Sequence, residues 1–226
     1  MKTRVFVATA VLVLFASYAR AGTIPYPNVG TPITTNTDVY ATQSSPLVLA
    51  YYWSASAADT DFIEVFDVTT GKFLSIASND SQSLADIQFF DNQPNPGSVA
   101  PGTALTLYGA TAGDILQLDL VNINTGLTLS SDPSTSPDGV SHAYVTPFSG
   151  TIPGSSVTIS NGVYIGMEDL TAAEGSDYDY NDVQYVMTGV APTPEPGSLL
   201  LLGTGLLGLA FALFRKNKPS GLVLHS

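Results

Sequence analysis

Cysteine is absent from the 226 residues of this chain, and basic residues are scarce. Without cysteine there is no disulfide, no zinc–thiolate site and no thiol nucleophile. Seven Lys and Arg stand against 19 Asp and Glu, which gives a formal net charge of −12. All the acidic residues lie in the segment 22–196, whose one Lys or Arg is Lys72. This charge pattern excludes electrostatic binding to nucleic acid or to an anionic membrane surface, because both need patches of Lys and Arg.

The first 21 residues have the three parts of a secretory signal peptide. Lys2 and Arg4 give a basic start, 5–18 is an apolar run, and a small–x–small pattern ends at Ala21. The apolar run is short for a membrane span. We therefore expect export of the chain, with cleavage after Ala21.

A second apolar run without a charge covers 198–214, and a basic tail follows over 215–226. As a helix this run would be about 26 Å long at 1.5 Å per residue, which is the low end of a membrane span. Basic residues next to a span stay on the cytoplasmic side. The pattern predicts a C-terminal transmembrane helix that places the acidic domain outside the cytoplasmic membrane.

A Pro-rich segment over 191–197 precedes this run and contains Pro194, Glu195 and Pro196. Over 192–218 the order of Pro-Glu-Pro, apolar helix and basic residues resembles the PEP-CTERM sorting signal. In that family the signal marks exported proteins of bacteria that make extracellular polysaccharide, and an exosortase-class protease cleaves near Pro-Glu-Pro. The resemblance implies an exosortase-class sorting protease as a partner, with exopolysaccharide as a further partner. It also implies a precursor anchored by its helix, which then reaches the cell surface or the extracellular matrix.

Short apolar runs separated by turn residues fill the middle of the chain. The run 62–68 alternates in character, and 73–77 would return after a four-residue turn as its hairpin partner. Other expected strands cover 47–53, 104–110, 115–121, 127–130, 143–148, 157–159, 163–167 and 183–189. The pattern predicts an all-β domain over 47–190, a β-sandwich or jelly roll. The preceding 22–46 is expected to be a linker or an edge strand.

The densest polar cluster of the chain covers 168–182, where six carboxylates repel one another with no basic residue among them. Asp177, Asp179 and Asn181 occupy alternate positions, so their side chains point the same way in an extended or looping segment. Hard oxygen ligands of this kind suit Ca²⁺. The EF-hand template does not fit, because it needs Gly at the sixth position, where Asp182 stands. The spacing leaves three readings open: a Ca²⁺ site, a solvated acidic turn and a catalytic pair.

Two short motifs in this cluster, 168–170 and 175–183, resemble the signature of the domain of unknown function 4114 family. The resemblance covers roughly 100–190, and the family is widespread in exported bacterial proteins. It implies a β-rich domain whose acidic residues serve metal binding or an enzymatic activity. Carried over to this chain, the metal-ligand candidates are Glu168, Asp169, Asp177, Asp179, Asn181 and Asp182.

The sequence offers little for catalysis. His142 is the only histidine between 22 and 196, and there is no Gly-x-Ser-x-Gly motif, so we expect a hydrogen-bonded strand histidine rather than part of a triad. A glycosidase needs two carboxyl groups at a set separation, which a sequence does not place. We therefore expect a non-enzymatic surface or matrix protein stabilised by Ca²⁺. The alternative is a secreted hydrolase that acts on polysaccharide through acidic residues.

Overall fold

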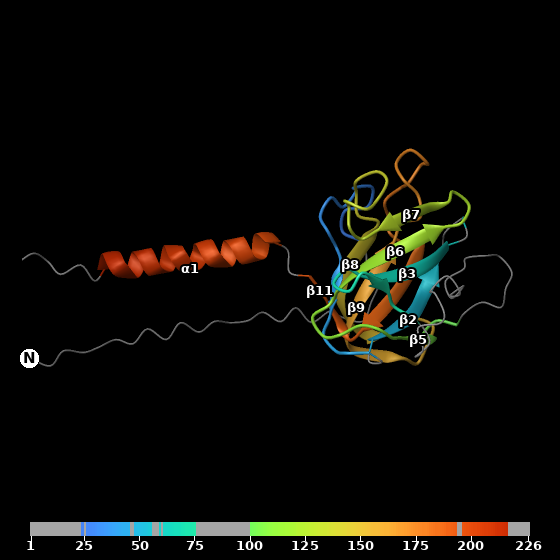
Figure 1. Cartoon of the computed structure of the whole chain (residues 1–226), viewed down its shortest axis with the longest axis horizontal. Coiled ribbons are helices and arrows are strands. Elements are labelled where there is room, and N and C mark those ends of the chain that lie inside the picture. Colours follow the sequence, from blue (N-terminus) through green and yellow to red (C-terminus); the bar gives the residue numbers. More distant parts are fainter. Residues whose placement is uncertain are drawn as a thin grey trace, which may run out of the picture.

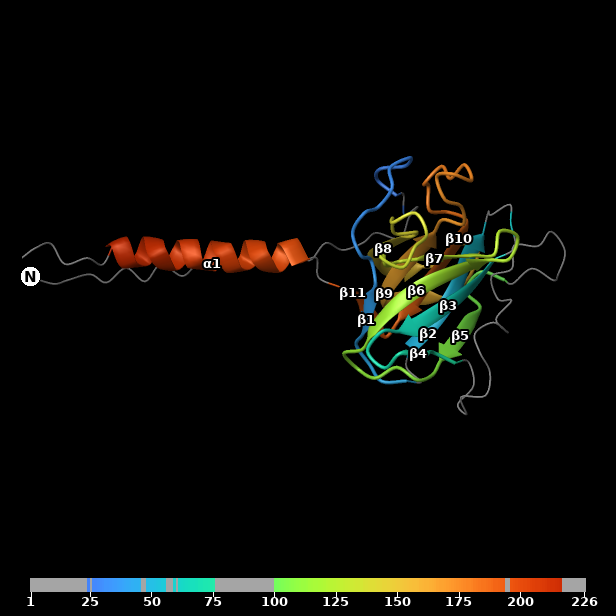
Figure 2. The ribbon, with the colours of Figure 1, turned by 45° about the horizontal axis from the view of Figure 1, so that its top comes forward.

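The computed structural model describes residues 24, 26–45, 48–55, 59, 61–75, 100–193 and 196–216. Within these ranges, strands β1 to β11 form two antiparallel sheets, and one helix, α1, follows them (Figures 1 and 2). The predicted signal peptide with Ala21 lies outside the described residues, as do Pro194 and Glu195.

The first sheet has the strand order β11-β1-β6-β3-β4, with β7 paired to β6. The predicted hairpin within it is confirmed: the Asp67 carboxylate accepts the backbone N–H groups of Thr69 and Thr70 and so fixes the turn. The strands are β1 (Val39–Ala41), β3 (Asp61–Asp67), β4 (Lys72–Phe73), β6 (Ile115–Asn122), β7 (Leu127–Ser130) and β11 (Val190–Pro192).

The second sheet has the order β5-β2-β10-β9-β8. The strands are β2 (Val48–Ala55), β5 (Ala104–Leu107), β8 (Ala143–Thr151), β9 (Thr158–Met167) and β10 (Val183–Thr188). The runs 157–159 and 163–167, expected as two strands, belong to one strand, β9. The reason is that β8 pairs along nearly all of β9, including Phe148 with Gly162. The pairing register shifts between Phe148 and Gly150, and the ladder continues beyond this shift.

A single main core lies between the two sheets, which confirms the all-β prediction. From β6, Leu116, Leu118 and Leu120 are fully buried on one face, as their alternation predicts. From the second sheet, Ile165 and Met167 of β9 pack into the same cluster. Burial of apolar side chains from both sheets is what holds this sandwich together.

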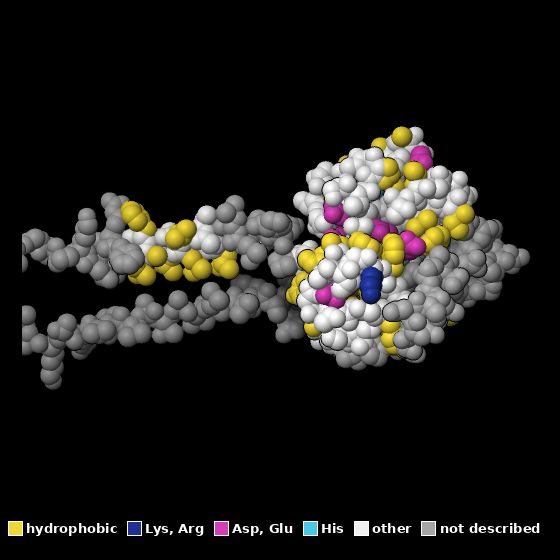
Figure 3. Space-filling model, in the orientation of Figure 1, with side chains coloured by type: hydrophobic (Ala, Val, Ile, Leu, Met, Phe, Trp, Pro, Cys, Tyr) yellow, Lys and Arg dark blue, Asp and Glu magenta, His cyan; other side chains and the backbone are white. Residues whose placement is uncertain are grey.

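The helix α1 covers Pro196–Lys216 and thus includes the whole predicted span. Figure 3 shows apolar side chains along its surface, and the large exposed ones are Leu202, Leu206, Leu207, Leu209, Phe211 and Leu213. Taken over the described residues, no helix is both long and apolar enough to cross a membrane. The predicted transmembrane helix is therefore not confirmed.

Candidate metal centre

The loop 168–182 joins β9 to β10 and carries every predicted metal ligand. It is the orange loop at the top of Figures 1 and 2, beside the blue segment that precedes β1 and the yellow-green loop between β7 and β8. Hydrogen bonds join these three segments. The Gly30 N–H donates to the Tyr178 carbonyl, and the Tyr180 hydroxyl accepts from the Ile33 N–H and donates to the Ser141 carbonyl.

The two ends of the loop are fixed by the strands that they continue. The Asp182 N–H donates to the Met167 carbonyl at 3.1 Å, and the Asp169 N–H donates to Asp182 Oδ2 at 2.9 Å. Because β9 and β10 pair antiparallel at Met167 and Val183, these contacts bring acidic residues from both ends of the loop together. The sheet register therefore builds the acidic cluster.

Two groups of carboxylates form within the cluster. In the inner group, Glu168, Asp169 and Asp182 each offer an oxygen within 4.8 Å of the others. In the outer group, Glu168, Asp177 and Asp179 do the same. Glu168 is shared and buried, while Asp177 is exposed at the rim. The structure thus divides the predicted ligands into two sets with one residue in common.

Asn181 lies beside the outer group, where its side-chain amide donates to the Asp179 carboxylate. The segment is a loop rather than an extended strand. Its backbone is turned by left-handed residues, with φ of 49° at Tyr178 and 55° at Tyr180. The carboxylate of Asp177 accepts the Asp179 N–H at 3.3 Å in one of these local turns. Left-handed non-glycine residues are costly and cluster at functional sites.

A close approach to β9 holds this strained segment in place. The Tyr180 ring is buried, and its carbonyl oxygen would lie 2.2 Å from a Cβ atom placed on Gly166. No side chain fits at that distance, so glycine is required at position 166. The glycine lets the loop press against the sheet directly beneath the outer group.

Burial and mutual repulsion raise the pKa values of the clustered acids. Burial raises the pKa of Glu168 to about 7, and the charges of Asp177 and Asp169 add to the effect. Burial, followed by the charges of Glu168 and Asp169, raises the pKa of Asp182 to about 9. Burial also raises the pKa of Asp179, as does the charge of Asp177. The folded domain is thus poised to take up protons or a cation here.

Sequence reasoning missed three residues near this site: Asp61 and Asn122 of the first sheet, and Asp59, which precedes β3. Burial raises the pKa of Asp169, and the charge of Asp59 adds to this rise, while the carboxyl of Asp61 acts to lower it. The Asn122 amide donates to Asp59 Oδ2 at 2.8 Å and to the Asp169 carbonyl at 3.0 Å. A signal was present: Asp61 stands on the same face of its strand as Ile63 and Val65, which predicts an inward-pointing carboxylate.

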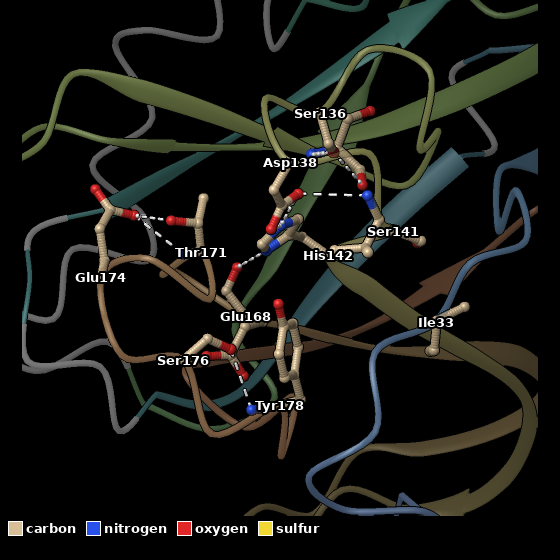
Figure 4. Close-up of polar contacts among 12 residues, drawn as sticks. Ile33, Ser136, Asp138, Ser141, His142, Glu168, Thr171, Glu174, Ser176 and Tyr178 are labelled. Carbon is tan, nitrogen blue, oxygen red and sulfur yellow. Dashed lines mark hydrogen bonds and ion pairs between the residues drawn. The ribbon is translucent and has the colours of Figure 1, made fainter.

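Figure 4 shows how His142 supports the loop. Its Nδ1 lies 3.2 Å from the Glu168 carbonyl oxygen, and its Nε2 lies 3.1 Å from Asp138 Oδ1. The Glu168 N–H in turn donates to the His142 carbonyl. Both ring nitrogens are therefore engaged, as predicted, although His142 directly precedes β8 and is not a strand residue. The histidine links Asp138 to the shared ligand of the two groups.

Residues 192–216 match the PEP-CTERM protein-sorting motif, which confirms the predicted sorting signal. The chain is thus an exported protein that carries the signal for sorting by exosortase. Neither the curated proteins nor the solved structures contain a match to this chain. The resemblance to the domain of unknown function 4114 family is not shown by these comparisons and stays a prediction.

Proposed function

We propose that this protein is a non-enzymatic component of the cell surface or extracellular matrix whose β-sandwich is stabilised by Ca²⁺ in the loop 168–182. The observation that carries the proposal is the shared, buried carboxylate of Glu168, which is flanked on both sides by further carboxylates. Among the described residues of the domain, the basic side chains are Lys72, in the β3–β4 hairpin, and His142, which already contacts Asp138. A bound cation is the remaining way to neutralise the cluster when it is ionised.

The spacing of the outer group suits Ca²⁺. Ligand oxygens lie about 2.4 Å from Ca²⁺, so two of them are at most about 4.8 Å apart. The oxygens of Glu168, Asp177 and Asp179 fall within this limit before any ion is present. Because Asp177 is exposed, water can complete the six to eight ligands that Ca²⁺ takes.

A thermal-melting experiment tests this proposal. The melting temperature of the secreted protein should rise in millimolar CaCl₂ and much less in NaCl of equal ionic strength, and Asp179→Asn should reduce the rise. Equal effects of the two salts would mean that only screening of charge repulsion is at work. Release of reducing sugar from polysaccharide by the same sample would instead support the alternative, a secreted hydrolase.

We further propose that α1 holds the precursor at the membrane until exosortase cleaves near Pro194–Pro196. The sorting match and the exposed leucines of α1 support this step. The intact mass of the mature protein is the test, since cleavage there removes roughly the last thirty residues. A mature protein that still ends at Ser226, in a host that has the protease, would contradict it.

A tyrosine-lined cavity supports exopolysaccharide as a partner. It has a volume of about 280 Å³, and its walls include Tyr26, Tyr144, Tyr164 and Tyr180 together with Asp179 and Asn181. The Tyr26 and Tyr144 rings meet edge to face with centroids 5.1 Å apart. Pockets with aromatic walls and a few polar groups are the usual form of small-ligand sites. Here the polar groups also belong to the loop that carries the outer group.

Retention on immobilised exopolysaccharide purified from the producing culture tests this partner. Tyr144→Ser should weaken retention at least several-fold, whereas Tyr108→Ser, outside the cavity, should leave it unchanged. Equal retention of both variants and the wild type would exclude the cavity as the binding site.

A further inference from the structure

We infer that the tyrosine-lined cavity selects a sugar that carries a protonated amino group. The inference rests on the proposed exopolysaccharide partner and names the kind of sugar that the cavity takes. The walls of the cavity come from β8, β9, β10, the segment 24–29 and loop 168–182. Tyr164 places it on the outer side of the second sheet, because Val163 and Ile165, its neighbours in β9, point into the main core.

The charge around the cavity favours a cation. Among the described residues, none that lines the cavity is basic, and its one carboxylate belongs to Asp179. The segment 22–196 as a whole carries 19 acidic residues and Lys72. The local carboxylate and the field of the domain therefore attract cations and repel anions. Uronic acids and sulfated or phosphorylated sugars are poor ligands for such a cavity.

The hydrogen-bond donors of the cavity are mostly used inside the protein. Three of its tyrosine hydroxyls donate to protein oxygens: Tyr26 to the Thr31 carbonyl at 2.6 Å, Tyr164 to Gln184 Oε1 at 2.7 Å, and Tyr180 to the Ser141 carbonyl at 3.1 Å. Gln184 Nε2 donates to the Asn181 carbonyl at 3.0 Å, and the Asn181 amide donates to the Asp179 carboxylate. The cavity therefore presents chiefly aromatic rings and acceptor oxygens, which suit a ligand that donates.

The tyrosine rings are fixed by contact with one another. The Tyr26 ring lies 5.1 Å from the Tyr144 ring and 4.6 Å from the Tyr180 ring, measured between centroids, with interplanar angles of 64° and 58°. The Tyr144 and Tyr164 rings are 6.3 Å apart at 63°. Rings inclined in this way form the corners of a box rather than a flat stack. A cation within about 6 Å of a ring centroid is attracted by the electron-rich face of the ring, and a cavity of about 280 Å³ keeps its occupant close to several rings.

A protonated amino sugar matches both features of the cavity. The C–H groups of its ring pack on tyrosine, and its ammonium group offers three donors and a positive charge. One of these donors can form a charge-assisted hydrogen bond with the Asp179 carboxylate. Acetylation of the amine removes the charge and leaves the rest of the sugar in place. The acetylated sugar should therefore bind roughly tenfold more weakly, since it loses the attraction of a desolvated cation to the rings.

Two oligosaccharides that differ only in this group test the inference. The full chain, in a non-ionic detergent at pH 6, is titrated in a calorimeter with glucosamine tetramer or with N-acetylglucosamine tetramer. EDTA keeps the Asp179 carboxylate free of Ca²⁺, and physiological ionic strength screens exposed charges beyond about 8 Å. The wild type should bind the glucosamine tetramer roughly tenfold more tightly. Asp179→Asn and Tyr144→Leu should each lose most of this preference, whereas Asp132→Asn, which removes a charge outside the cavity, should keep it.

The outcomes separate this inference from the proposed partner. Equal affinity for the two tetramers, lost in Tyr144→Leu, would overturn the inference and leave exopolysaccharide as the partner of the cavity. A preference that Asp132→Asn weakens as much as Asp179→Asn would mean that the total charge of the domain holds the ligand, which also overturns it, as does a wild type that binds neither tetramer. If Tyr144→Leu does not fold, Asp179→Asn decides alone, because asparagine keeps an oxygen that can accept the Asn181 N–H.

Discussion

Buried carboxylates occupy two regions of this domain, and the two regions treat them differently. Asp38, which directly precedes β1, and Asp119 of β6 are buried, and burial raises the pKa of each. Neutral donors serve both. Asp38 accepts from Ser131 Oγ at 2.5 Å, and Asp119 accepts from Gln117 Nε2 at 2.9 Å and 3.0 Å. At the β9–β10 end, by contrast, the carboxylates of Asp169 and its neighbours face one another.

The difference shows what a hydrogen bond can and cannot do for a buried acid. Hydrogen-bond donors offset much of the desolvation penalty of a buried acid, as Ser131 and Asn36 do for Asp38. They do not remove the repulsion between several carboxylates in one place, which grows as the surroundings become less polar. The carboxylates near β1 and β6 are satisfied by hydrogen-bond donors of the domain itself. Those at the β9–β10 end need protons or a cation. The following predictions test this contrast.

Removal of Ca²⁺ should have the largest effect. A ligand that binds only the native state at a hundredfold excess over its Kd adds about 2.7 kcal/mol of stability. Chelation should therefore lower the melting temperature by roughly 5–10 °C. Differential scanning calorimetry with and without EDTA measures this shift.

Controls for this prediction use other salts. MgCl₂ should restore less of the melting temperature than CaCl₂, because Mg²⁺ demands a smaller octahedral shell and keeps its water. An EDTA-treated sample that melts at the same temperature as the Ca²⁺-loaded sample would show that the β9–β10 end needs no cation.

Gly166→Ala should have the next largest effect. The added methyl group would meet the Tyr180 carbonyl oxygen at 2.2 Å, so the loop must shift away from β9. Overpacking of this kind typically costs about 1–3 kcal/mol, and the displaced loop should also lose affinity for Ca²⁺. Both variants are measured in the unprocessed chain, where Gly203→Ala is the control, since nothing lies within 4 Å of its new methyl group. Unchanged Ca²⁺ affinity in Gly166→Ala would separate the loop position from metal binding.

The pH dependence of the metal-free domain should run opposite to that of most acidic sites. The pKa of Glu168 rises from 4.5 to about 7 on folding, so the native state binds more protons than the unfolded state in this interval. The contribution of Glu168 to the free energy of unfolding is then fully present below about pH 4.5. It is lost as the pH rises towards 7, by an amount on the order of 2 kcal/mol. The pKa of Asp182, at about 9, extends the loss to higher pH.

Saturating Ca²⁺ should abolish this loss, because metal ligands must be deprotonated and the ion replaces the protons. Urea unfolding at pH 5, 7 and 9, in EDTA and in CaCl₂, gives the two profiles. Metal-free stability that increases from pH 5 to pH 9 would refute the predicted uptake of protons.

Much of this architecture was readable from local patterns. Alternation over 62–68 and the turn before Phe73 predicted the β3–β4 hairpin, and the leucines of β6 predicted a core face. These features depend on contacts close in sequence. The break expected between 157–159 and 163–167 was wrong because the ladder with β8 continues across a polar stretch.

The candidate site was readable only in part, for a related reason. Loop 168–182 can be identified in the sequence by its density of acidic residues. The influence of Asp61 on Asp169 depends instead on how two sheets pack, which one sequence does not fix. The available sign was a carboxylate on the inward face of an alternating strand. This sign is ambiguous, because Asp67 lies on the same face of β3. That residue caps a turn and needs no ion.

The smallest effect is expected for Asp119→Asn, and it tests the other side of the comparison. Asparagine keeps an oxygen that can accept from Gln117 Nε2 and loses only a charge that burial already disfavours. The free energy of unfolding should change by less than about 1 kcal/mol, and the rise in melting temperature with Ca²⁺ should equal that of the wild type. Asp182→Asn makes the same chemical change in the other region and should reduce that rise. Thermal melts of both variants, with and without Ca²⁺, provide the measurement. A reduced Ca²⁺ response in Asp119→Asn would mean that the ion acts on the total negative charge of the domain rather than on the carboxylates at the β9–β10 end.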